Sequence, residues 1–163
     1  MMTLLVPTDF SKASRKAVIY AADLAKKVNA QVILLNVVQV NTSGETLLKW
    51  KRLEDEMVKI AKEDGEELLA EVRKKAGAKA QLSFEYRLGY DFAKVVNRFI
   101  EENDVDLIIM GTHGATGLKK VLMGSNAASM INTSLVPVIA IPADAVFKPI
   151  KKNCVCYRHG EPG

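Results

Sequence analysis

The sequence predicts an α/β fold built on a single doubly wound, five-stranded parallel sheet with helices on both faces. Segments with apolar residues at helical spacing alternate with short apolar segments of strand length along the chain. One strand-like segment, residues 31–38 (QVILLNVV), is almost continuously apolar, which is typical of strands buried on both faces. Alternating strands and helices imply parallel strands joined by helical crossovers. The simplest doubly wound order for five such strands is 3-2-1-4-5.

The first half of the chain supplies two strands and one helix. Residues 3–9 (TLLVPTD) begin as a short buried strand. Ser11 is an N-cap candidate for a helix whose apolar residues recur at helical spacing, and Asn29 is a candidate for its end. Residues 31–38 form the second strand.

A long amphipathic helix is predicted from about residue 45 to residue 75. The apolar residues predicted to share its buried face are Leu47, Trp50, Leu53, Met57, Ile60, Ala61, Leu68 and Val72. Gly65 lies on the same face and costs about 1 kcal/mol relative to alanine. Close packing onto the sheet or a mere helix irregularity explains it equally well. The charged residues between the apolar positions are predicted to form a solvated face.

The second half of the chain supplies three more strands. Residues 80–88 (AQLSFEYRL) alternate between apolar and polar side chains, as an edge strand does, and Asp91 is predicted to cap the helix that follows. Residues 105–110 (VDLIIM) form the fourth strand, and a glycine-rich segment leads to a short helix from about Ser125. Residues 136–142 (VPVIAIP) form the fifth strand.

Composition fits one globular domain. The chain has 163 residues, of which 48% are hydrophobic and 26% charged, and we expect a domain over residues 1–141 and a basic tail over residues 142–163. The net charge is +4, but the tail accounts for half of it, so the nearly balanced domain gives no indication of nucleic-acid binding. No apolar run reaches the roughly 20 residues that cross a bilayer, and the first residues do not resemble a signal peptide. The two cysteines are consistent with a reducing cytoplasm.

The predicted strand order also predicts where a ligand binds. In doubly wound sheets, ligands bind outside the carboxyl ends of the strands where the order reverses, here between the first and fourth strands. The first strand ends in PTD with Asp9, and the fourth runs into GTHG with Gly111 and Gly114. These glycines allow positive φ and a close approach of the backbone to a ligand. Gly124 and Ser125 begin the short helix, whose N-terminal N–H groups favour an anion.

These residues match the three chemical needs of a nucleotide. Asp9 repels phosphate but accepts hydrogen bonds from ribose hydroxyls. Val37 and Met110 end their strands with apolar side chains able to sandwich a base. Taken alone, Asp9 is explained as a helix cap and the glycines as turns, but chance does not readily place all of these features at the one edge where the fold predicts a site. A P-loop is excluded because Gly117 is followed by Leu118, Lys119 and Lys120.

The PTD after the first strand and the pattern Gly111-x2-Gly114-x9-Gly124-Ser125 resemble the ATP-binding branch of the universal stress protein family. The resemblance covers residues 1 to about 141. It implies that ATP (or AMP) binds with Mg or Mn on its phosphates. The residues it places around adenine and ribose are Pro7, Thr8, Asp9, Val37 and Met110. Those it places at ribose and phosphates are Gly111, Gly114, Gly124 and Ser125, with the backbone of Asn126 and Ala127.

Two features depart from the family pattern. Asn126 and Ala127 stand where relatives often carry a hydroxyl residue or small aliphatics, so one side-chain contact to phosphate is in doubt. The tail is also longer than the family core needs. His113 is a tempting general base, but relatives commonly carry it without being efficient enzymes, and we assign no catalytic residue.

The fifth strand would be an open edge of the sheet, where unpaired backbone groups invite pairing. Relatives pair this strand with its copy, so we expect a homodimer. In the tail, Cys154, Cys156 and His159 are three potential metal ligands, but structural zinc sites use four and usually C-x2-C, so a disordered or partner-bound tail is favoured.

The leading functional hypothesis is a nucleotide-binding regulatory or stress-response module that hydrolyses ATP slowly at most. One alternative is an enzyme that activates a second substrate through the same site. The other is an AMP-binding or vestigial dimeric scaffold. The sequence does not name the signal or the protein partner.

Overall fold

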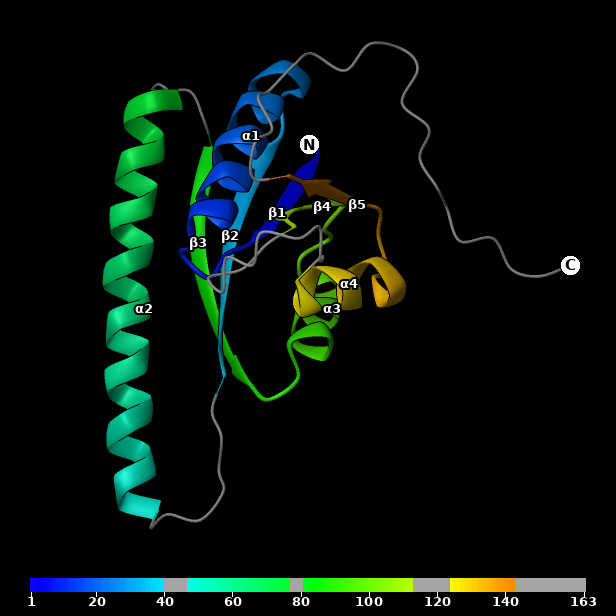
Figure 1. Cartoon of the computed structure of the whole chain (residues 1–163). Coiled ribbons are helices and arrows are strands. Elements are labelled where there is room, and N and C mark those ends of the chain that lie inside the picture. Colours follow the sequence, from blue (N-terminus) through cyan, green and yellow to red (C-terminus); the bar gives the residue numbers. More distant parts are fainter. Residues whose placement is uncertain (40–46, 77–80, 113–123, 143–163) are drawn as a thin grey trace, which may run out of the picture.

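The computed structural model describes residues 1–39, 47–76, 81–112 and 124–142, which form one sheet with helices on both faces (Figure 1). The strand order is β3-β2-β1-β4-β5, and each pairing of these strands is parallel. Both the predicted class and the predicted order are therefore confirmed. The elements are β1 (Thr3–Pro7), α1 (Lys12–Val28), β2 (Gln31–Gln39), α2 (Leu47–Ala76), β3 (Gln81–Gly89), α3 (Phe92–Glu102), β4 (Leu107–Gly111), α4 (Ser125–Thr133) and β5 (Val138–Ile141).

Two hydrophobic layers enclose the sheet. On one face, Leu4 and Leu34 pack with residues of α1 and α2. On the other face, Leu5 and Leu35 pack with residues of α3 and α4, including Phe99. Neighbouring residues of β1 and β2 thus contribute to opposite layers, and β1 is buried along its whole length. This explains why the central strands are apolar at nearly every position.

The predicted helix boundaries follow from capping. The Ser11 hydroxyl accepts a hydrogen bond from the Ser14 N–H at 3.3 Å and caps α1. Asn29 ends α1 in the left-handed conformation, with φ 54°. The Asp91 carboxylate accepts from the Lys94 N–H at 3.1 Å and caps α3. Each of these residues is a type that is favoured at such an end.

Gly65 explains how closely α2 approaches the sheet. A Cβ atom at this position would collide with the ring of Phe84 on β3. Of the two explanations left open by the sequence, close packing is the one that holds. The ring of Phe84 also lies against that of Phe10, with centroids 6.2 Å apart.

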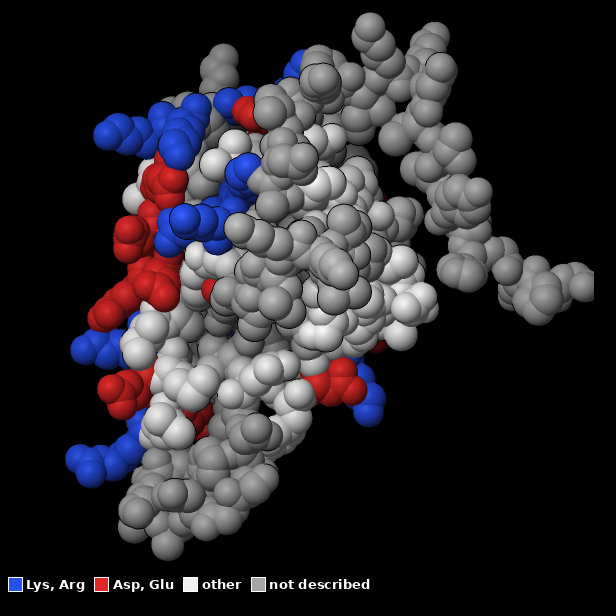
Figure 2. Space-filling model, in the orientation of Figure 1, with Lys and Arg blue, Asp and Glu red and all other residues white. Residues whose placement is uncertain are grey.

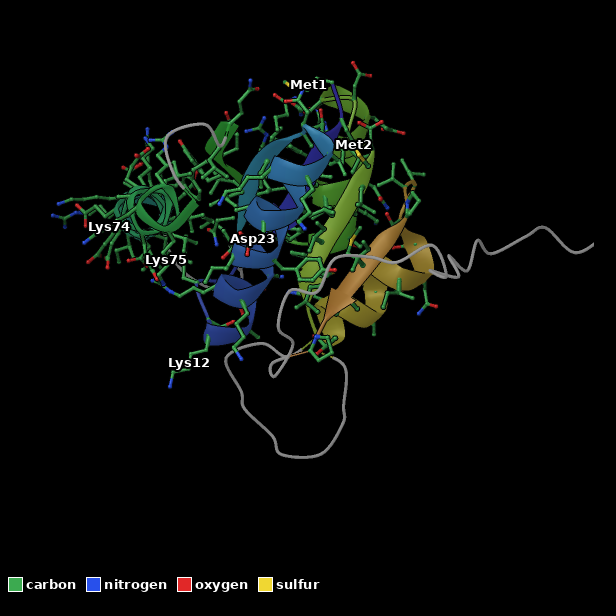
Figure 3. The ribbon with its side chains drawn as sticks, turned by 90° about the horizontal axis from the view of Figure 1, so that it is seen from above. Met1, Met2, Lys12, Asp23, Lys74 and Lys75 are labelled. Carbon is green, nitrogen blue, oxygen red and sulfur yellow. The ribbon has the colours of Figure 1, made fainter. Side chains whose placement is uncertain are left out.

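The apolar face of α2 is only partly buried. Ala61, Leu68 and Val72 are buried, as predicted. Leu53 and Ile60, which were expected on the same buried face, are 48% and 51% exposed. The reason is geometric: the lower part of α2 extends past the end of α1 (Figure 1). The two helix axes are also not parallel, since Figure 3 shows α2 end-on and α1 obliquely.

Part of the sequence-based prediction lies outside the described residues. This applies to Gly114, His113, Lys119 and Lys120, and to the tail after Pro142 with its two cysteines and His159. Among the described helices, none is both long enough and apolar enough to cross a membrane.

Candidate nucleotide-binding site

A cavity of about 320 Å³ opens at the carboxyl ends of the central strands, where the order reverses between β1 and β4. Its volume lies within the range of small-molecule sites. Ten of the predicted site residues line it: Pro7, Thr8, Asp9, Val37, Met110, Gly111, Gly124, Ser125, Asn126 and Ala127. The structure therefore brings together two segments about 100 residues apart in the chain.

The segment from β1 to α1 is held rigidly by hydrogen bonds. The Thr8 N–H donates to the Leu35 carbonyl at 2.9 Å, and the Asn36 amide donates to the Thr8 carbonyl at 2.8 Å. These two bonds extend the pairing of β1 with β2 beyond Pro7. The Thr8 hydroxyl is buried and lies 3.1 Å from the Ser14 hydroxyl. The backbone that enters the cavity is thus held by hydrogen bonds within the protein.

Asp9 presents a carboxylate at the cavity wall. One oxygen accepts from the Ser11 N–H at 3.1 Å, which closes a tight turn. Partial burial raises the pKa of Asp9, but hydrogen bonds from the hydroxyls of Ser11 and Ser14 and from backbone N–H groups outweigh it, so the pKa lies below its ordinary value. The carboxylate is consequently ionised at neutral pH and is a strong hydrogen-bond acceptor.

Gly111 is required by packing within the protein. A Cβ atom there would lie 2.8 Å from the carbonyl carbon and oxygen of Ala13 on α1. Its φ is outside the left-handed range, so the expectation of a positive φ at Gly111 is wrong. The close approach is to α1, and it lets α1 begin directly beside the cavity.

Gly124 anchors the start of α4 at the cavity. Its N–H donates to the Thr112 carbonyl at 2.6 Å, which ties the helix to the end of β4. No side chain caps α4 at Gly124, and the Ala128 N–H donates to the Gly124 carbonyl at 2.9 Å. The N–H groups of the first turn, from Ser125 to Ala127, belong to the set that lacks an intrahelical acceptor. They provide a partial positive charge suited to an anion.

Four further lining residues were not predicted: Ser14, Asn36, Gln39 and Phe92. Asn36 had a detectable signal, because it is the one polar residue within the apolar run of residues 32–38. Phe92 adds an aromatic ring to the apolar wall of Val37 and Met110. Its position at the start of α3 is set by the fold, and the local sequence gave no indication of it.

Comparison with known proteins identifies the family. The model of the universal stress protein family matches residues 1–142. The chain belongs to the universal stress protein family. It is similar to universal stress protein MJ0531 of Methanocaldococcus jannaschii, with 33% identity over 143 residues, which are 85% of this chain and 80% of the relative. The solved structure of MJ0577 from the same organism has 27% identity and a TM-score of 0.75, covering 86% of this chain and 95% of the other.

More distant solved structures of the family contain adenine nucleotides. One universal stress protein was solved with cAMP (23% identity, TM-score 0.64, covering 86% and 96% of the two chains). The protein from Archaeoglobus fulgidus was solved with dAMP (20%, 0.60, 86% and 97%) and one from Arabidopsis thaliana with AMP (19%, 0.55, 89% and 94%). At these identities the similarity establishes the shared fold.

Proposed function

We propose that the chain binds ATP in this cavity and acts as a nucleotide-dependent regulatory or stress-response module of the universal stress protein family. The observation that carries the proposal is the convergence of three chemistries in one cavity. An apolar wall, an ionised acceptor carboxylate and an uncapped helix N-terminus meet there. Adenine, ribose and phosphate require these three features in turn.

The geometry supports a role for each wall. Val37 and Met110 contact the base, and the carboxylate of Asp9 accepts from the ribose hydroxyls beside Pro7 and Thr8. The first turn of α4 holds the phosphates through the N–H groups of Asn126 and Ala127, with Gly124 and the Ser125 hydroxyl beside them. Gly111 lines the cavity beside them, and the family resemblance assigns Gly114, which lies outside the described residues, to the same ribose and phosphates.

Mg or Mn accompanies the phosphates in this proposal. Asp9 is the only carboxylate among the described lining residues, and it is assigned to the ribose. A metal bound with the nucleotide would take phosphate oxygens and water as ligands, as is usual for Mg bound with a nucleotide.

Binding, and not rapid catalysis, is the proposed activity. The described lining residues contain no histidine, lysine or arginine to stabilise a leaving phosphate. Hydrolysis, where it occurs, is slow. The distant relatives solved with cAMP, dAMP and AMP support an adenine nucleotide, and AMP is the alternative ligand.

We further propose a cytoplasmic homodimer in which β5 pairs with its copy across a two-fold axis. Within the described sheet, β5 is paired on one side only, by β4. The nearby side chains of Ile131 and Leu135 are 38% and 58% exposed. An unpaired edge next to exposed apolar side chains is well suited to an isologous contact.

The test begins with the purified full chain. We expect denaturation to release an adenine nucleotide identifiable by mass spectrometry, or calorimetric titration with ATP and Mg²⁺ to show binding. Gly124→Val is the informative variant, because φ −57° and ψ 147° accommodate valine while its side chain blocks the phosphates. We expect at least about tenfold weaker binding.

Asn132→Val on the exposed far end of α4 is the matched control and should leave affinity unchanged. If no nucleotide is retained or bound, the proposal fails in favour of a vestigial scaffold. If Gly124→Val binds ATP normally, the phosphates lie elsewhere. Rapid turnover of ATP only with a second substrate would favour the enzyme alternative.

A further inference from the structure

The N-terminal half of α2 carries exposed apolar side chains in a row. Leu53 and Ile60 are 48% and 51% exposed, and Met57 between them is half-buried. Spacings of four and three residues place all three on one face of the helix. We call these three residues the apolar stripe.

The same face of α2 is covered nearer its C-terminus. Glu71 lies three turns beyond Ile60 on this face, and its carboxylate accepts from the Arg15 guanidinium of α1 at 2.8 Å. Towards its N-terminus, α2 extends past the end of α1 (Figure 1). The apolar stripe therefore continues the face of α2 that packs on α1, beyond the point where α1 ends.

Charges beside the apolar stripe follow a distinctive order. Arg52, Glu56, Lys59 and Glu63 are all exposed, and their spacing of four, three and four residues places them along one flank of the stripe. Their signs alternate, and Figure 2 shows bands of opposite charge along α2. Lys59 and Glu63 lie 3.9 Å apart with side chains 75% and 67% exposed, so this pair is loose and free to exchange partners.

We propose that the apolar stripe is a self-association surface, on which α2 of a second copy packs antiparallel about a two-fold axis between residues 57 and 58. This axis brings Arg52 opposite the partner's Glu63 and Glu56 opposite the partner's Lys59. The two-fold repeats each pair, giving four opposite-charge pairs along one side of the two stripes. A parallel two-fold arrangement places the two charged flanks on opposite sides of the contact, so only the antiparallel arrangement pairs these charges.

The expected contact is weak by itself. The stretch from Arg52 to Glu63 is about 18 Å long at 1.5 Å per residue. One helix pair of this length buries much less than the roughly 1,600 Å² of a standard interface. We therefore expect reversible association at high micromolar concentrations, and stronger association at low salt than at high salt.

This contact is independent of nucleotide binding and of β5. The helix α2 packs over β3 and β2, at the opposite edge of the sheet from β5. Both contacts can form in one assembly, in which case the α2 contact links dimers. Its measurable signature is a concentration-dependent mass above that of the basic unit, whether monomer or dimer.

Cysteine cross-linking tests the geometry in the full chain with Cys154→Ser and Cys156→Ser. We expect an Arg52→Cys chain mixed with a Glu63→Cys chain to form a mixed disulfide under mild oxidation, well above the level of either chain alone. A mixture of Lys94→Cys and Glu101→Cys chains, both exposed on α3, measures random collisions. Cross-links within each single variant at or above the mixed level would overturn the proposal, because in the proposed contact residue 52 lies opposite the partner's residue 63 and not opposite its own copy. Mixed cross-links at the collision level would overturn it as well.

Sedimentation equilibrium tests the chemistry. We expect Arg52→Glu or Glu63→Arg alone to weaken association at least fivefold, and the double exchange to restore it. Leu53→Gln with Ile60→Gln should abolish it, with an unchanged circular dichroism spectrum. Association that ignores these substitutions overturns the proposal. So does association that appears only after residues 143–163 are deleted, because the chain's own tail would then occupy the stripe.

Discussion

Replacing Asp9 by asparagine should weaken ATP binding by about 10- to 150-fold. Asparagine keeps an oxygen for the Ser11 N–H, so the turn that positions residue 9 is retained. What is lost is the negative charge and one of the two acceptor oxygens. A hydrogen bond to a charged group contributes about 1.5–3 kcal/mol, and each 1.4 kcal/mol corresponds to a tenfold change in affinity. Calorimetric titration measures this difference directly.

The ribose assignment is tested by changing the ligand as well as the protein. With 2′,3′-dideoxy-ATP the hydroxyl donors are absent, so the wild-type chain and Asp9→Asn should bind about equally. Asp106→Asn is the matched control. Asp106 also accepts from a backbone N–H, that of Thr3 at 2.7 Å, but it lies at the amino ends of β1 and β4, away from the cavity. An equal loss with ATP and the dideoxy ligand would refute the assignment of Asp9 to ribose.

Two predictions concern stability, one from the packing of Gly65 on Phe84 and one from the hydrogen bonds of Asp9. Gly65→Ala should destabilise the fold by about 1–3 kcal/mol in urea unfolding, because the clash with Phe84 outweighs the gain in helix propensity of about 1 kcal/mol; a more stable variant would contradict the packing. Because the pKa of Asp9 is lowered by folding, its ionised form stabilises the protein above its ordinary value of 3.8, and this contribution disappears as pH falls through the lower folded pKa. The difference in unfolding free energy between wild type and Asp9→Asn should therefore be present at pH 7 and shrink below about pH 4.

The fold was predictable because its determinants are local. Ser11, Asn29 and Asp91 mark helix ends by chemistry that acts over three or four residues. The continuous apolar run of β2 and the alternating pattern of β3 distinguish a central strand from an edge strand. Once the order of elements is known, the sheet topology predicts a site at the carboxyl ends of the central strands, which is why residues from both halves of the cavity were predicted.

The unpredicted parts of the cavity depend on contacts between distant segments. Phe92 lines the cavity because α3 begins beside the end of β2. Gly111 is glycine because the Ala13 carbonyl passes 2.8 Å from where its Cβ would lie. The sequence shows that residue 111 is glycine, but Ala13, the neighbour that requires it, is 98 positions away. From the sequence alone, close approach to a ligand and close approach to a helix explain this glycine equally well.

The face of α2 illustrates a second limit of periodicity. The pattern that runs through Leu53, Ile60 and Leu68 correctly identifies one side of the helix. Whether that side is buried depends on how much of α2 the neighbouring helix covers. Because α1 is 17 residues long and α2 has 30, α1 cannot cover the whole of α2. The apolar row continues past the end of α1, and its flanking charges are ordered so as to complement an antiparallel copy. The departure from the expected burial is thus the feature of α2 that a second protomer explains.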